Sequence, residues 1–109
     1  MGRIKHIKNK FRKDLSAEFS IEDAKIISEK LGINFAKEQF DLQQFLFGIN
    51  VELEHGKRNP KTNVTNDEPI LTGKIALAHL MEFPDYYIRL KKLEEEAKAY
   101  WNSLNKSST

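Results

Sequence analysis

The sequence predicts an all-α fold, and three observations lead to that prediction. Apolar residues recur at spacings of three and four in several stretches, which is the helical period. Residues that cap helices well, such as Ser20 and Asp41, stand just before those stretches. No long alternating apolar run and no Asn-Gly or Asp-Gly turn indicates a strand or a hairpin. We therefore expect one small domain of about four helices.

The first helix is expected over residues 21–31. Ser20 supplies the N-cap, and Glu22 and Asp23 place negative charge near the exposed N–H groups of the first turn. Gly32 ends this helix, because glycine readily adopts the left-handed conformation of a C′ residue.

The second helix is expected over residues 41–55, with Asp41 as its N-cap and Gly56 at its end. Gly48 in its middle costs up to about 1 kcal/mol relative to alanine, so we expect another helix to approach closely there. Apolar residues lie on two sides, which predicts a central helix. The main stripe is Leu42, Phe45, Leu46, Ile49 and Leu53, and the opposite side carries Phe47 and Val51.

A long polar loop over residues 57–71 separates the second helix from the third, which we expect over 73–83 with Thr72 as its cap. The Phe83-Pro84 step ends the third helix, because the residue before proline avoids the helical region. A fourth helix then runs over 84–105. Its apolar stripe is Tyr86, Leu90, Leu93, Ala97, Trp101 and Leu104.

Composition describes a single soluble domain of 109 residues without cysteine, so neither a disulfide nor a thiolate metal site is expected. Residues 1–13 form a basic arm, residues 14–105 the helical domain, and residues 106–109 a loose tail. The arm contains no acid, while the rest of the chain has a balance of −4. Such an arm favours contact with a protein partner or with nucleic acid. Its basic residues are Arg3, Lys5, Lys8, Lys10, Arg12 and Lys13.

Two carboxylate–imidazole pairs are the main chemical feature. Glu52 and His55 are three residues apart on the second helix, and His79 and Glu82 are three apart on the third. Ile75, His79 and Glu82 fall within about 40° of one line on a helix. We expect these groups to meet in a buried polar cluster. Its expected members are Glu52, Glu54, His55, His79, Glu82, Tyr86 and Tyr87.

Two interpretations of this cluster stand side by side. The leading one is a hydrogen-bonded network, because buried His and Glu side chains commonly pair with each other and with Tyr hydroxyls. The alternative is a metal site, since imidazole and carboxylate ligands suit zinc, iron or manganese. Its ligands would be Glu52, His55, His79 and Glu82, although a di-metal site of the helical-bundle type needs further carboxylates.

The motifs GINVELEHG, TNVTNDEP and TGKIALAHLMEFPDYYIRL resemble a family of small proteins of unknown function from bacteria, phages and large DNA viruses. The resemblance covers residues from about 20 to 96. It implies no activity, but it implies a viral or phage setting, with some members as particle components. The matching positions are Gly48, Val51, Glu52, Glu54, His55, Ile75, Ala76, His79, Leu80, Glu82, Pro84, Tyr86, Tyr87 and Leu90.

For function, we expect a non-enzymatic interaction or structural protein that uses its arm to hold a partner, as a component of a viral or phage particle. One alternative is a metal-binding domain acting as a small hydrolase or nuclease. A second is a nucleic-acid binder that works through the arm. No apolar run approaches the roughly 18 residues of a membrane span, and no signal peptide is recognised. We therefore expect an intracellular or virion location.

Overall fold

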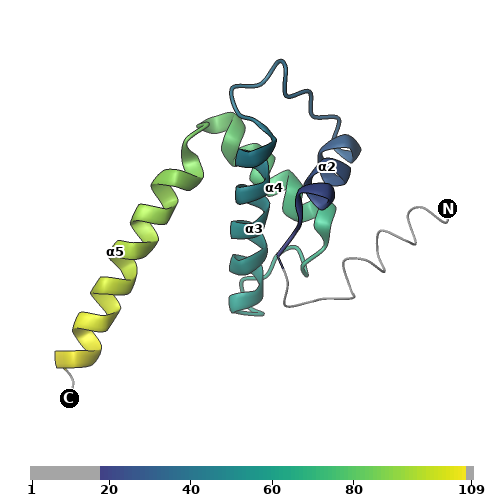
Figure 1. Ribbon diagram of the computed structural model, residues 1–109. Helices are drawn as coiled ribbons and strands as arrows, with labels where there is room; N and C mark the ends of the chain where they lie inside the picture. Colours follow the sequence, from purple (N-terminus) through teal and green to yellow (C-terminus); the bar gives the residue numbers. More distant parts are fainter. Residues whose placement is uncertain (1–17, 108–109) are drawn as a thin grey trace.

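The computed structural model describes residues 18–107, and within that range the chain forms helices and no strand, as Figure 1 shows. The helices are α2 (Ile21–Lys30), α3 (Leu42–Arg58), α4 (Pro69–Glu82) and α5 (Tyr86–Ser107). The all-α prediction is confirmed. The basic arm of residues 1–13 lies outside the described residues. In the described part of the chain, no helix is both long and apolar enough to cross a membrane.

Helix α3 packs against α2, α4 and α5, and α4 likewise packs against α2, α3 and α5. Phe45 and Ile49 of α3 are fully buried, and they lie in one core with Ile27 of α2 and Leu80 of α4. Phe40, in the connector before α3, is also buried and meets the ring of Phe35 edge-on at 5.9 Å. The two-sided apolar pattern therefore correctly predicted that α3 has neighbours on both faces.

Capping boxes begin both α2 and α3. The Ser20 hydroxyl accepts a hydrogen bond from the Asp23 N–H at 3.1 Å, and the Asp23 carboxylate accepts one from the Ser20 N–H at 2.9 Å. Asp41 and Gln44 exchange the equivalent bonds, each at 2.8 Å. Each box satisfies two N–H groups at the helix start, so the predicted starts of these helices are confirmed.

The predicted start of α4 is wrong by one turn. The helix begins at Pro69, and Glu68 is the N-cap, whose carboxylate accepts from the Leu71 N–H at 2.7 Å. Proline fits the first helical position because it has no N–H to satisfy there. Thr72 lies inside the helix instead, where its hydroxyl donates to the Glu68 carbonyl at 2.8 Å.

The polar loop is shorter than predicted, because α3 also continues through Gly56 to Arg58. The connection between α3 and α4 folds back on Gly56, since a Cβ there would lie 3.0 Å from Asn63 Oδ1. The Asn63 side chain accepts from the Asn66 N–H at 2.9 Å and donates to Asp67 at 3.1 Å. These bonds give the connection the defined shape that its composition favours.

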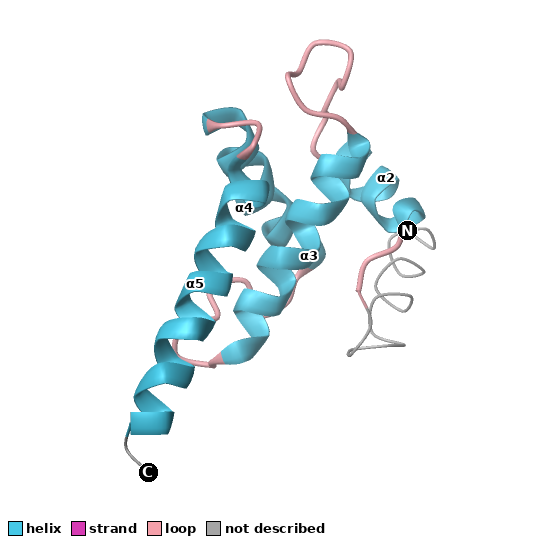
Figure 2. Cartoon of the chain, turned by 60° about the vertical axis from the view of Figure 1, so that its left-hand side comes forward, coloured by secondary structure: helices cyan, strands magenta, loops and turns pink. Residues whose placement is uncertain are grey.

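Helix α5 leaves the other helices at an angle, and its C-terminal part extends beyond them in both Figure 1 and Figure 2. The break before it is the predicted one: α4 ends at Glu82, and Phe83 is extended before Pro84. Helix α5 begins at Tyr86 and ends at Ser107, two residues later at each end than predicted. We call residues 86–94 the near half of α5 and residues 95–107 its far half.

Candidate functional site

A triangle of polar atoms lies where α3, α4 and α5 meet. The Tyr87 hydroxyl donates to Glu52 Oε2 at 2.7 Å. His79 Nδ1 lies 3.0 Å from the same oxygen and 3.1 Å from the Tyr87 hydroxyl oxygen. Each helix contributes one group, so this triangle links all three helices at a single point.

The geometry of the triangle fixes the proton on the histidine ring. Glu52 Oε2 is an acceptor, and Tyr87 has already donated its one hydroxyl proton to it. A bare Nδ1 would direct its lone pair at the carboxylate oxygen, which is repulsive. His79 Nδ1 therefore carries a proton and donates it to Glu52 Oε2, so one carboxylate oxygen receives two hydrogen bonds.

Aromatic rings surround the triangle. The Tyr86 ring stacks on the His79 imidazole with 4.1 Å between centroids and 12° between planes. Tyr87 is 2% exposed, and its ring meets that of Phe47 edge-on at 6.3 Å. Burial, together with the hydrogen bond to Glu52 and its charge, raises the pKa of Tyr87 well above its usual range.

Gly48 makes room for this arrangement. A Cβ on Gly48 would lie 2.6 Å from Cε2 and 3.0 Å from Cδ2 of the Tyr87 ring. The tyrosine ring of α5 therefore lies directly on the backbone of α3. The expected close approach of another helix at Gly48 is confirmed, and it explains how a residue that weakens helices is accommodated there.

His55 belongs to a separate contact. Its Nε2 lies 2.5 Å from Glu94 Oε2, and this pair joins the end of α3 to α5. The two side chains are 37% and 30% exposed, so solvent screens the pair more than it screens the triangle. His55 and Glu94 form a second, weaker tie between α3 and the near half of α5.

The remaining predicted members of the cluster lie elsewhere. Glu54 is exposed and pairs with Arg58 one helical turn away, at 3.2 Å. Glu82 is also exposed. It influences the cluster only through its charge, because burial first, and then the charges of Glu52 and Glu82, raise the pKa of Tyr86. Of the seven residues predicted to meet, the structure therefore brings together Glu52, His79, Tyr86 and Tyr87.

The four residues predicted as metal ligands do not converge. Glu52 and His79 are in contact, but His55 pairs with Glu94, and Glu82 is exposed. Among residues 18–107, no group of three or more His, Asp or Glu side chains lies close enough to hold a metal ion. The geometry instead matches the hydrogen-bonded network that the sequence also predicted.

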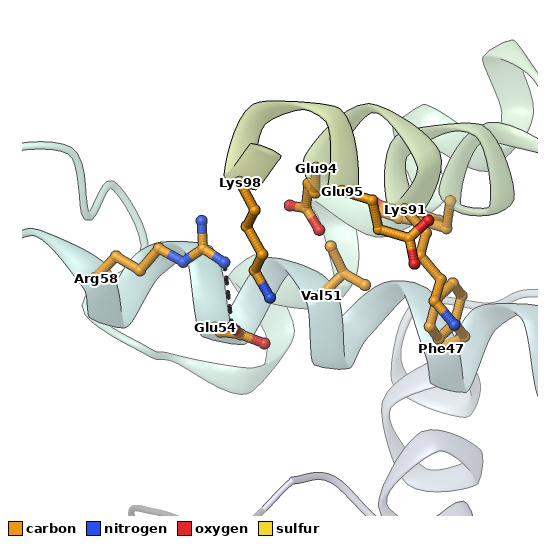
Figure 3. A pocket seen from close by; sticks show the side chains of 9 residues that line it. Phe47, Val51, Glu54, Arg58, Lys91, Glu94, Glu95 and Lys98 are labelled. Carbon is orange, nitrogen blue, oxygen red and sulfur yellow. Dashed lines mark hydrogen bonds and ion pairs between the residues drawn. The ribbon is translucent and has the colours of Figure 1, made fainter. Parts of the chain in front are cut away.

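A groove runs between α3 and α5 beside this cluster, as Figure 3 shows. Phe47 and Val51 lie between the two helices, and Tyr87 and charged side chains from both helices line the rest of the groove. Its volume of about 240 Å³ is below the range of roughly 300–1,000 Å³ that is usual for small-molecule sites. We therefore regard this groove as the open margin of the α3–α5 contact.

Sequence reasoning missed Glu94 as a member of the site. A signal was present, because Glu94 follows Tyr87 by seven residues and therefore lies on the same face of α5. Its spacing of four from Lys98 is also that of an ordinary surface ion pair within one helix. The contact with His55 became visible only once the crossing of α3 and α5 was known.

Together, these features define a small helical domain whose last helix is fixed by a partly buried polar triangle. The chain belongs to the family described as Protein of unknown function (DUF5661), whose model matches residues 24–96. The matched region contains the whole triangle and the near half of α5. No curated protein and no solved structure matches the chain.

Proposed function

We propose that this protein is a non-enzymatic interaction protein, and that it binds another protein chain through the exposed part of the α5 stripe, from Leu93 to Leu104. The observation that carries this proposal is the apolar stripe of α5, which continues past the core into solvent. Leu93 and Trp101 are each 59% exposed, Tyr100 is 58% exposed and Leu104 is 43% exposed. Exposed apolar side chains that are contiguous on one face mark interaction surfaces.

The composition of this surface supports a protein partner. Tyr and Trp are enriched at the centre of protein interfaces, where they supply most of the binding energy. Tyr100 and Trp101 also contact each other edge-on, with 5.0 Å between ring centroids. Neighbouring aromatic residues on a rigid helix lose little conformational freedom when a partner covers them.

The polar triangle supports the same function indirectly. It fixes the near half of α5 to α3 and α4, and it therefore sets the direction in which the far half projects. Its three polar atoms are hydrogen-bonded to one another, which suits a structural role better than catalysis. A pre-oriented binding helix loses less entropy on association than a mobile one.

Two further parts of the proposal concern membership in a viral or phage particle and binding by the basic arm of residues 1–13. The resemblance to viral and phage proteins supports membership in a particle, which immunodetection on purified particles would test. The charge of residues 1–13, with six Lys and Arg and no acid, supports contact of the arm with nucleic acid or with an acidic protein surface. Both add to the interaction made by α5 and neither replaces it.

A site-specific photocross-linker tests the proposed interface. We would place p-benzoylphenylalanine at position 101 or, as a control, at position 88, which is 55% exposed on the opposite side of the same helix. Irradiation in cells that express the protein should give a covalent adduct with a protein chain from position 101 and none from position 88. No adduct from position 101, or equal adducts from both positions, would contradict the proposed function.

A further inference from the structure

We infer that the partner of the α5 stripe is a second copy of this chain, docked antiparallel across a two-fold axis at Ala97. This inference deepens the proposed function and depends on it, because it uses the same face. It rests on the symmetry of the stripe and on the place where α4 covers it.

The stripe is symmetric about Ala97. Leu93 and Trp101 lie four residues on either side, and Leu90 and Leu104 lie seven residues on either side. A two-fold interface requires one patch to be complementary to itself, so that residue i meets residue j and j meets i. An antiparallel pair centred on Ala97 places Leu93 of one copy against Trp101 of the other. The small alanine at the axis lets the two helices approach closely.

The charged residues beside the stripe affect the strength of this arrangement. The two-fold axis keeps each flanking position on the same edge as its counterpart in the other copy, because the axis is perpendicular to both helices. Lys98 of each copy then lies about two residues' rise from Glu94 of the other, which gives two pairs of opposite charge. On the other edge, Glu96 of one copy lies beside Glu96 of the other, and this like-charge contact weakens the pair.

The point where α4 covers the stripe and the C-terminal end of α5 also agree with this register. The stripe is covered at its start, because Tyr86 stacks on His79 of α4. Helix α5 ends at Ser107, and in this register Ser107 of the second copy lies opposite Tyr87. The second helix therefore ends where α4 begins to cover the face. The two cores lie at opposite ends of the pair, because each core packs on the near half of its own α5.

The available area indicates a reversible dimer. Aromatic side chains bury about 150–250 Å² each when fully covered. Tyr100 and Trp101 are each a little over half exposed, and Leu93 and Leu104 are also exposed. Covering these four side chains would bury roughly half of the ~800 Å² per partner that is usual in stable complexes. Smaller interfaces are typical of weak, reversible association, so the dimer should dissociate on dilution.

Sedimentation velocity of the full chain over a concentration series tests the pairing. We expect a monomer–dimer equilibrium whose Kd rises by roughly 30-fold or more in Trp101→Asp, the loss typical of a central aromatic anchor. Ile88→Asp is the matched control, since Ile88 is equally exposed on the opposite side of α5, and its Kd should be unchanged. A monomer at every concentration, or a dimer that Ile88→Asp weakens as much as Trp101→Asp, would overturn the inference.

The register has its own test, because the chain contains no cysteine. Mild oxidation should link two copies of Ala97→Cys, which meet at the axis, and should not link Ala99→Cys, which lies on the opposite side of the helix. Lys98→Glu should raise the Kd by roughly two- to tenfold, because Lys98 lies near Glu94 of the other copy, and Glu96→Gln should lower it, because it removes a like-charge contact. Linkage of Ala99→Cys in place of Ala97→Cys would overturn the proposed axis.

The two proposals can fail separately. A monomeric chain whose position 101 cross-links to a different protein would overturn the second copy as partner and leave the interaction function standing. A chain that gives neither a dimer nor an adduct would contradict both.

Discussion

The two halves of α5 carry one apolar stripe into two different environments. In the near half, Tyr86 begins the stripe and stacks on His79, and Tyr87 beside it is 2% exposed and lies against Gly48 and Glu52. In the far half, Trp101 continues the same stripe and is 59% exposed. The difference shows that helical periodicity identifies the face that seeks burial, whereas the length of the neighbouring helices decides how much of it the chain itself buries. The remainder is available for a partner.

The largest expected contrast comes from the same kind of truncation in each half. Tyr87→Ala should lower the free energy of unfolding by about 3–5 kcal/mol, because it removes a buried ring and leaves Glu52 with one donor fewer. Trp101→Ala should change it by no more than about 0.5 kcal/mol in a dilute sample, because the side chain is exposed. Urea denaturation followed by circular dichroism measures both. Equal losses would show that the two halves are not distinct.

The effect of Gly48→Ala on stability should have opposite signs in the wild-type chain and in a Tyr87→Ala background. Gly48→Ala should destabilise the wild-type chain by about 1–3 kcal/mol, because its Cβ collides with the Tyr87 ring. In a Tyr87→Ala background the ring is gone, and the same change should stabilise the protein by up to about 1 kcal/mol, because alanine favours helix. Denaturation of the four variants of this cycle supplies the test. The same sign in both backgrounds would mean that the collision with Tyr87 is not the cause.

Alkaline pH should lower the free energy of unfolding through Tyr87 in the near half of α5. The pKa of Tyr87 is raised in the folded protein from 10.0, so its contribution is fully present below about pH 10. Above that pH the unfolded chain releases the phenol proton and the folded chain keeps it, so stability falls as pH rises. The fall attributable to Tyr87 approaches about 1.4 kcal/mol per pH unit. Tyr87→Phe should show a shallower fall between pH 10 and pH 11. An identical slope in the two proteins would exclude Tyr87 as its origin.

The smallest expected effect on stability comes from deleting residues 1–13. The described core is formed from Phe19 onward, so the free energy of unfolding should change by no more than about 0.5 kcal/mol. Binding to DNA, measured against salt concentration, should lose most of its salt dependence, because six cationic side chains are removed. Lys91→Ala with Lys92→Ala, on the helical body, is the control. A deletion that leaves DNA binding unchanged would remove the arm from the proposed function.

The fold could be predicted from sequence because its signals are local. Capping boxes and helical periodicity depend on neighbouring residues, as at Ser20 and Asp41, and the starts of the two helices there were predicted correctly. The start of α4 was misplaced because Thr72 and Glu68 can both cap a helix, and threonine is the commoner cap. Pro69 next to Glu68 was the deciding local signal.

The candidate site was predictable only in part. Glu52 and His79 lie on faces that turn toward each other, and the periodicity of each helix showed those faces. The partner of His55 depends on where α5 crosses α3, and Glu94 is 39 residues away in sequence. The periodicity of one helix contains no information on a crossing angle. Contacts that such an angle creates, including the ring of Tyr87 on Gly48, could be anticipated only as an approach by some other helix.

Amide hydrogen exchange along α5 tests the contrast between its halves most directly. In the wild-type chain, at a concentration where the dimer forms, both halves should be protected. In Trp101→Asp, the amides of the far half should lose their protection, and those of the near half should keep it. Protection of the far half that does not change with Trp101→Asp, or a near half that loses protection equally, would contradict the account.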